Sequence, residues 1–122
     1  MTNAINWFEI PVVDFTRAKK FYETVLSAEM QGMEMHGMQS AFFPADLQKG
    51  IGGCITKANG YEPSDKGALV YLNGGEDLSV ALSRVETAGG KIVMPKTSIG
   101  QNGFMAHFMD TEGNKVALHS MK

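Results

Sequence analysis

The spacing of apolar positions changes along the chain, and these changes predict strands and helices. Residues 5–13 are rich in Ile, Trp, Phe and Val, which is typical of a strand. Asp14 follows as a helix N-cap, because its carboxylate can accept from the free N–H groups of a first turn. From Phe15 to Leu26 the apolar residues recur at helical spacing. The residues after this helix predict a hairpin of 30–35 and 39–44, which turns at His36-Gly37, and a strand over 50–57.

The second half repeats this order. Residues 68–72 predict a strand, and Asp77 is the candidate cap of a helix over 78–88 that ends at Gly89-Gly90. Three strands are predicted after it, over 91–94, 104–109 and 115–120. Superposing Asp14-Phe15 on Asp77-Leu78 therefore gives two βαβββ units, an internal repeat.

This repeat predicts one α+β domain over 1–122, with module one at about 1–58, a linker at about 59–66 and module two at about 67–122. Placed side by side, the modules are expected to form an incomplete mixed β-barrel with helices on the outside. The polar, glycine-bearing loop 96–103 is a candidate flap over a site in this barrel.

Composition excludes several classes of protein. The net charge of −2 gives no electrostatic footprint for nucleic acid, and no long apolar run suggests a membrane span. Cys54 is the only cysteine, so neither an intrachain disulfide nor a cysteine-based zinc site is expected. The first residues lack the pattern of a signal peptide, and a cytoplasmic protein is expected. Nine Met residues suit adaptable apolar cavities, although most are expected to fill gaps in the core.

Three segments carry a resemblance to a known family. They are Phe8-Glu9-Ile10-Pro11-Val12-Val13-Asp14, the Arg17-Ala18-Lys19-Lys20-Phe21-Tyr22 that follows, and the run from Phe108 to Leu118 with its Asp-Thr-Glu-Gly-Asn turn. Together they resemble the vicinal oxygen chelate superfamily, which includes glyoxalase I, the bleomycin-resistance proteins and the extradiol dioxygenases. The resemblance implies the paired-module barrel, a small-molecule cleft and a homodimer. The fold alone does not imply one reaction.

The resemblance also implies where a metal would be held. Metal-using members carry His, Gln or Glu at four strand positions, which here match Trp7, Cys54, Ala68 and Ala117. Indole and methyl groups cannot ligate a cation, so no metal and no cofactor are predicted. The remaining possibility is a displaced site for zinc, nickel or iron formed by Glu9, His107 and His119.

Strand alternation from the matched positions predicts which residues face the cleft. Glu9 shares the face of Trp7, His119 shares that of Ala117, and Val70 and Leu72 share that of Ala68. The resemblance places His107 in the cleft. The predicted ligand-binding residues are Trp7, Cys54, Phe104 and Ala117, and the predicted catalytic residues are Glu9, His107 and His119.

The first strand leaves two interpretations open for each of its cleft residues. Trp7 either stacks on a planar ligand or fills the space that a metal would occupy. Glu9 is either a general base, with its pKa raised by an apolar surrounding, or an ordinary residue that pairs with Lys115 or Arg17 or reaches water at the rim.

The remaining candidates also have plain alternatives. His107 and His119 can bind a ligand or transfer a proton, or they are an interior residue and a residue near the chain end. Cys54 is a small buried apolar residue unless a neighbour stabilises its thiolate. His36 is expected to be a solvated turn residue.

Three functions remain, of which we favour the first. One is a metal-free binding protein that takes an aromatic or amphipathic small molecule. The second is a glyoxalase-I-like lyase or isomerase, or a dioxygenase-related enzyme, with a non-standard metal or a metal-free His/Glu site. The third is an interaction module whose cleft is closed by Trp7.

Overall fold

The computed structural model describes residues 2–122 and contains both predicted βαβββ units. The expected domain range begins at Met1, which lies outside the described residues. The first unit consists of β1 (Trp7–Pro11), α1 (Phe15–Leu26), β2 (Gln31–Met35), β3 (Met38–Phe42) and β4 (Gly52–Lys57). The second consists of β5 (Tyr71–Asn73), α2 (Leu78–Leu82), β6 (Lys91–Ser98), the short 3₁₀ helix η1 (Gly100–Asn102), β7 (Phe104–Met109) and β8 (Lys115–Ser120).

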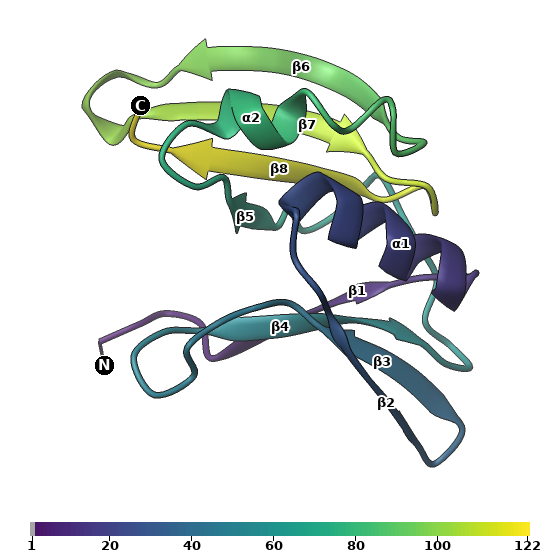
Figure 1. The fold of residues 1–122 in the computed structure, drawn as a ribbon. Coiled ribbons are helices and arrows are strands. Elements are labelled where there is room, and N and C mark those ends of the chain that lie inside the picture. The colour runs from purple at the N-terminus through teal and green to yellow at the C-terminus, as the bar shows by residue number, and fades with distance from the viewer. Residues whose placement is uncertain (1) are drawn as a thin grey trace.

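The strands form two four-stranded sheets with the same plan (Figure 1). Their orders are β1-β4-β3-β2 and β5-β8-β7-β6. In each sheet the first pair is parallel, because a helix and a hairpin separate its strands, and the other pairs are antiparallel. The expected α+β fold with an incomplete mixed barrel is confirmed, and the two sheets do not close into one barrel.

Helix α1 contacts both sheets. The ring of Tyr22 lies 5.3 Å from that of Phe43 beside the first sheet, and the ring of Phe21 lies 5.9 Å from that of Phe108 in the second. The hydroxyl of Tyr22 also donates to Asp110 at 2.6 Å, at the end of β7. One helix face thus fills a core that both units share (Figure 1).

The three sequence segments that carried the resemblance contact one another. Glu112, in the β7–β8 turn, accepts from the backbone N–H groups of Val13 and Asp14 at 2.9 and 2.7 Å. The Arg17 side chain donates to the same carboxylate at 2.8 Å. Asn114 donates to the carbonyl of Pro11 at 2.8 Å. These residues therefore hold the end of β1 against the second unit, and their role is structural.

Helix α2 is shorter than the predicted helix over 78–88. Asp77 caps it as expected, accepting from Ser79 N at 2.9 Å. Beyond Leu82 the backbone continues as turns, in which Arg84 and Val85 donate to the carbonyls three residues before them. Val85 is nevertheless fully buried, because these tighter turns keep its side chain facing the core.

Several predicted strand limits also need correction. Strands β1 and β4 are shorter than expected, and β3 ends at Phe42. Strand β5 begins only at Tyr71, and β6 runs on to Ser98. The expected flap over 96–103 is therefore wrong in its first part: Thr97 and Ser98 pair with β7, and Lys96 forms an ion pair with Asp77 at 2.9 Å. Within residues 2–122, no helix is long and apolar enough to cross a bilayer.

Candidate functional site

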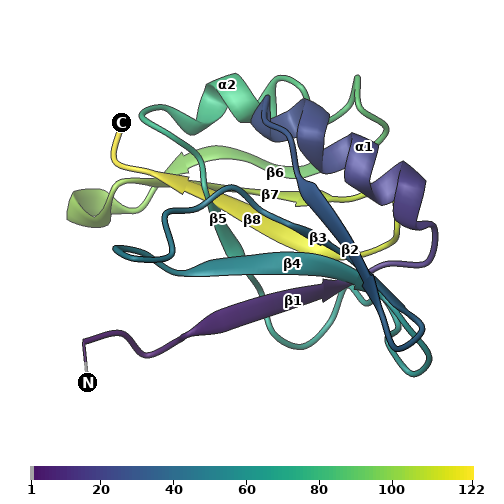
Figure 2. The ribbon, with the colours of Figure 1, turned by 60° about the horizontal axis from the view of Figure 1, so that its bottom comes forward.

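Each sheet turns one side toward the shared core and leaves an open face on the other. Strand register defines the first open face, because Glu9 pairs with Cys54, Cys54 with Phe42, and Ser40 with both Thr56 and Met33. Its residues are Trp7, Glu9, Met33, Met35, Met38, Ser40, Phe42, Cys54 and Thr56. Figure 2 brings this sheet forward from the bottom of Figure 1.

A cavity of about 290 Å³ lies on the first open face. The rings of Trp7 and Phe42 meet edge to face there, with their centres 5.9 Å apart. Three methionines and the polar His36, in the hairpin turn, complete the lining. Met33 and Met35 are 43% and 49% exposed, so this apolar surface is open to solvent in the single chain.

Two residues that line this cavity, Glu9 and Cys54, belong to a small polar network. The hydroxyl of Tyr61 donates to Glu9 Oε1 at 3.0 Å, which raises the pKa of the tyrosine. The thiol of Cys54 lies 3.8 Å from Glu9 Oε2 and 3.2 Å from Thr56 Oγ1. Burial raises the pKa of Cys54, so the thiol form is favoured over a nucleophilic thiolate.

The second open face is formed by β5, β7 and β8. Tyr71 and His107 both pair with Ala117, and Asn73 and Met105 both pair with His119. The hydroxyl of Tyr71 lies 3.4 Å from His107 Nε2. His107 is only 8% exposed, and its buried Nδ1 has no hydrogen-bond partner within the described residues. Burial, with a smaller effect of Lys115, lowers the pKa of His107, so its ring is neutral at neutral pH.

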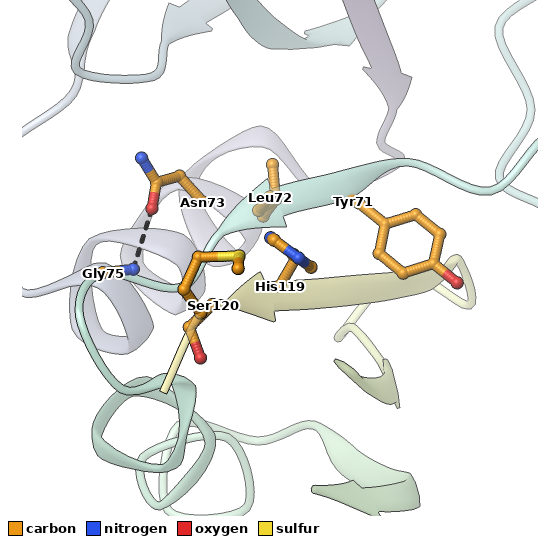
Figure 3. A pocket seen from close by; sticks show the side chains of 7 residues that line it. Tyr71, Leu72, Asn73, Gly75, His119 and Ser120 are labelled. Atoms are coloured by element: carbon orange, nitrogen blue, oxygen red, sulfur yellow. Dashed lines mark hydrogen bonds between the residues drawn. The ribbon is translucent and has the colours of Figure 1, made fainter. Parts of the chain in front are cut away.

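A separate cavity of about 570 Å³ lies at one edge of the second open face (Figure 3). Tyr71, Asn73, His119 and Met121 contribute to its lining. The Nε2 of His119 lies 2.7 Å from the carbonyl of Asn102 and must carry a proton to donate to it. Asn73 accepts from the N–H of Gly75 at 2.9 Å, the bond drawn in Figure 3.

The structure corrects the predicted orientation of the fifth strand. Ala68 precedes β5, and Leu72, which was expected in the cleft, is 5% exposed in the shared core. Val70 packs at the edge of the same core. Tyr71 is the residue that shares the open face with Ala117. Alternation counted from Ala68 gave the opposite face, and only the pairing with β8 could have revealed this.

Phe104 also lies on the helix-facing side of its sheet. Its neighbour Met105 shares the open face with His107, whereas Phe104 packs against the core. The ammonium group of Lys96 lies 4.6 Å from the centre of the Phe104 ring. Phe104, which was predicted to bind the ligand, is therefore not on the open face, and Met105 lies there instead.

The predicted site residues are thus divided between two faces. Trp7, Glu9 and Cys54 lie together on the first open face, and His107, Ala117 and His119 lie on the second. Glu9 lines three cavities, of about 870, 290 and 210 Å³. Neither His107 nor His119 lines any of these three. Within residues 2–122, no group of three or more His, Cys, Asp or Glu side chains is placed to hold a metal ion.

Sequence reasoning missed Tyr61, which holds Glu9. It lies in the linker between the units, where no strand or helix period indicates a direction. The sequence pattern also gave no orientation for Met33 and Met35, because an isolated edge hairpin can present either face.

Two βαβββ units that share one core and carry open sheet faces define a class of paired-module proteins. Residues 4–118 match the family model of the Glyoxalase/Bleomycin resistance protein/Dioxygenase superfamily. A glyoxylase-like domain-containing protein of Didymella fabae is 31% identical over an alignment of 120 residues, and the match covers 93% of this chain and 91% of that protein. The chain therefore belongs to the glyoxalase/bleomycin resistance/dioxygenase superfamily.

Solved structures support the same fold. A glyoxalase/bleomycin resistance protein from Albidiferax ferrireducens has a TM-score of 0.77 and 15% identity, with 98% of this chain and 100% of that chain covered. A glyoxalase I mutant from Zea mays has a TM-score of 0.70 and 24% identity, with 94% of this chain covered. This chain spans 45% of the length of that enzyme. At these identities the likeness concerns the fold alone.

Proposed function

We propose that this protein binds a small aromatic or amphipathic molecule against the first open face. One observation carries the proposal: Trp7, Phe42 and three methionines line a cavity together with the few polar groups of Glu9, Cys54, Ser40 and His36. An apolar hollow with a small number of placed polar groups is the usual composition of a small-molecule site.

The side chains at the four positions that match metal ligands support binding without a metal. The positions that the resemblance matches to metal ligands hold Trp7, Cys54, Ala68 and Ala117. An indole N–H only donates, a methyl group has no lone pair, and the single thiol is favoured in its protonated form. These residues do not fit a divalent metal, and no step of the proposed function depends on one.

We also propose that the protein acts as a homodimer. In support, the open faces leave Trp7, Met33, Met35 and Tyr71 substantially exposed in the single chain. A partner that lies across these faces, with the ligand cavity enclosed between the two chains, would remove apolar surface from water, which is the main favourable contribution to association. A cytoplasmic location stays a prediction.

Calorimetric titration with a panel of one- and two-ring aromatic compounds tests the binding function. Because Trp7 is the only tryptophan, its fluorescence reports on this cavity. Trp7→Leu is expected to weaken binding roughly two- to twelvefold, since an aromatic contact contributes about 0.5–1.5 kcal/mol. Val80→Ala, at an exposed position on α2, serves as the control. Failure of every aromatic compound to bind would count against the proposal.

A lyase or isomerase is a second candidate, favoured by one observation. His107 is a buried neutral imidazole beside the phenol of Tyr71, a pair that can move a proton near neutral pH. NMR of small carbonyl compounds incubated with the protein in heavy water would detect exchange of the proton next to the carbonyl. Exchange that disappears in His107→Ala would favour this candidate over binding alone.

A further inference from the structure

We propose that the cavity on the first open face takes a small planar organic cation, with its ammonium or amidinium group at Glu9 and its ring against Trp7. This inference rests on the proposed binding function and gives the chemical class of the ligand. It concerns only the 290 Å³ cavity and none of the histidines of the second open face.

Glu9 sets the charge of this cavity. The cavity is otherwise lined by Trp, Phe, Met, Ser and Cys side chains and by His36 at its rim. The ion pairs formed by the described residues are Arg17–Glu112, Lys19–Glu23, Lys66–Asp65 and Lys96–Asp77, and none includes Glu9. A carboxylate that no protein cation neutralises favours a positively charged ligand.

The hydrogen bonds of Glu9 leave room for such a ligand. Tyr61 uses one lone pair of Oε1, at 3.0 Å. The contact of Oε2 is the thiol of Cys54 at 3.8 Å, which is a weak donor at a long distance. An ionised carboxylate can accept about four hydrogen bonds, so Oε2 retains acceptor capacity for an N–H donor. A bond between two charged groups is also about twice as strong as a neutral one.

The wall beside Glu9 suits the body of an aromatic cation. Trp7 shares the face of Glu9 two residues earlier on β1 and meets Phe42 edge to face. A ligand ring packed against the Trp7 indole would gain about 0.5–1.5 kcal/mol, the usual contribution of an aromatic pair. The thioethers of Met33, Met35 and Met38 are polarizable and flexible, so they can adapt to rings of different outline.

The size of the cavity limits the ligand. A volume of about 290 Å³ is at the lower end of ordinary ligand sites and suits a molecule of one or two rings. On another side of Glu9, Lys66 and Lys115 line the cavity of about 210 Å³, and these cations would favour an anion there. The two charge preferences are opposite, so matched probes of different charge separate them.

Calorimetry at pH 7.5 and low salt with 1-naphthylmethylammonium, 1-naphthylmethanol and 1-naphthoate tests the inference. The cation is expected to bind at least about tenfold more tightly than the alcohol, and the anion most weakly. Glu9→Gln is expected to remove the preference for the cation while the alcohol still binds. Glu34→Gln, an equal change of charge on the exposed strand β2 but on its other face, is expected to keep the preference.

The outcomes separate the ligand class from the binding function. Equal binding of cation and alcohol, or tighter binding of naphthoate, overturns the inference but leaves the proposed function standing. Absence of binding by all three probes counts against both. A preference that survives Glu9→Gln overturns the inference as well. If circular dichroism shows that Glu9→Gln is unfolded, quenching of Trp7 by the three probes on the native protein still measures the charge preference at this cavity.

Discussion

Glu112 is the residue on which the contact between the two units depends most directly. Its side chain is fully buried and accepts hydrogen bonds from two backbone N–H groups, from Arg17 and from Thr111. Burial by itself would raise the pKa of this carboxyl, but the bonds to the charged form lower it to about 2. The ionised form is therefore the one that the native state holds.

Glu112→Gln is expected to reduce the free energy of unfolding by about 1–3 kcal/mol at pH 7, because a charged acceptor of several donors is lost. The native pKa of Glu112 lies below its usual value near 4.5, so its stabilising effect is complete above that value. The effect then decreases as the pH falls toward about 2. Urea unfolding of both proteins between pH 7 and pH 3 measures the difference.

The difference in free energy of unfolding between the native protein and Glu112→Gln should become smaller as the pH is lowered. Glu86→Gln, at an exposed position, is the control and should differ little from the native protein at any pH. If Glu112→Gln lowers the free energy of unfolding by the same amount from pH 7 to pH 3, the charge of the carboxylate is not the source of its stabilising effect.

At the scale of the elements, α1 connects the two sheets. Tyr22 is fully buried, and its hydroxyl contacts Asp110 while its ring lies against Phe43. Burial and the nearby Asp110 raise the pKa of Tyr22 well above its ordinary value, so it remains a donor over the whole stability range of the protein. The helix therefore makes the two units depend on one core.

Removing this hydroxyl should affect the whole chain. Tyr22→Phe is expected to lower the free energy of unfolding by about 1.5–3 kcal/mol, the usual contribution of a hydrogen bond to a charged group. Because both units share the core, urea unfolding should remain a single transition. Tyr71→Phe, at a residue that is 48% exposed, should change stability by less than about 0.5 kcal/mol. Two separate transitions in Tyr22→Phe would contradict a shared core.

For the whole molecule, the arrangement of the open faces favours association with another chain. Both sheets turn their helix-facing sides to the shared core, so the open faces carry exposed apolar side chains such as Trp7, Met35 and Tyr71. Strands β1 and β5 are also free edges of their sheets within the described residues. Exposed apolar patches and free edges are typical of surfaces that pair with another chain.

Light scattering coupled to size exclusion is therefore expected to give twice the mass of one chain. Met35→Glu is expected to shift the protein toward the monomer, because it places a charge in the apolar patch. Val80→Glu puts the same charge at an exposed valine on α2 and should leave the mass unchanged. A native protein that is monomeric at high micromolar concentration would contradict the homodimer.

Much of the fold could be predicted from local pattern. Period-2 and helical spacing located the eight strands and both α-helices of residues 2–122, although β5 begins three residues later than predicted and η1 was not foreseen. Asp14 and Asp77 marked both α-helix starts. The site could be predicted only in part. Trp7, Glu9 and Cys54 were brought together correctly, because parallel pairing of β1 with β4 follows from the βαβββ plan. Tyr61 and Tyr71 were not found, since one lies in an irregular linker and the other depends on the register of β5.

The sequence by itself determined the two βαβββ units, their family and the residue types available for chemistry. These follow from periodicity and capping, which act between residues close together in the chain. Only the tertiary structure decided that α1 fills one core between the units and that the predicted site residues lie on two separate faces. The physical reason is that strand register and the packing of a shared helix depend on contacts between distant residues. A shift of one residue in a strand moves a side chain from one face to the other.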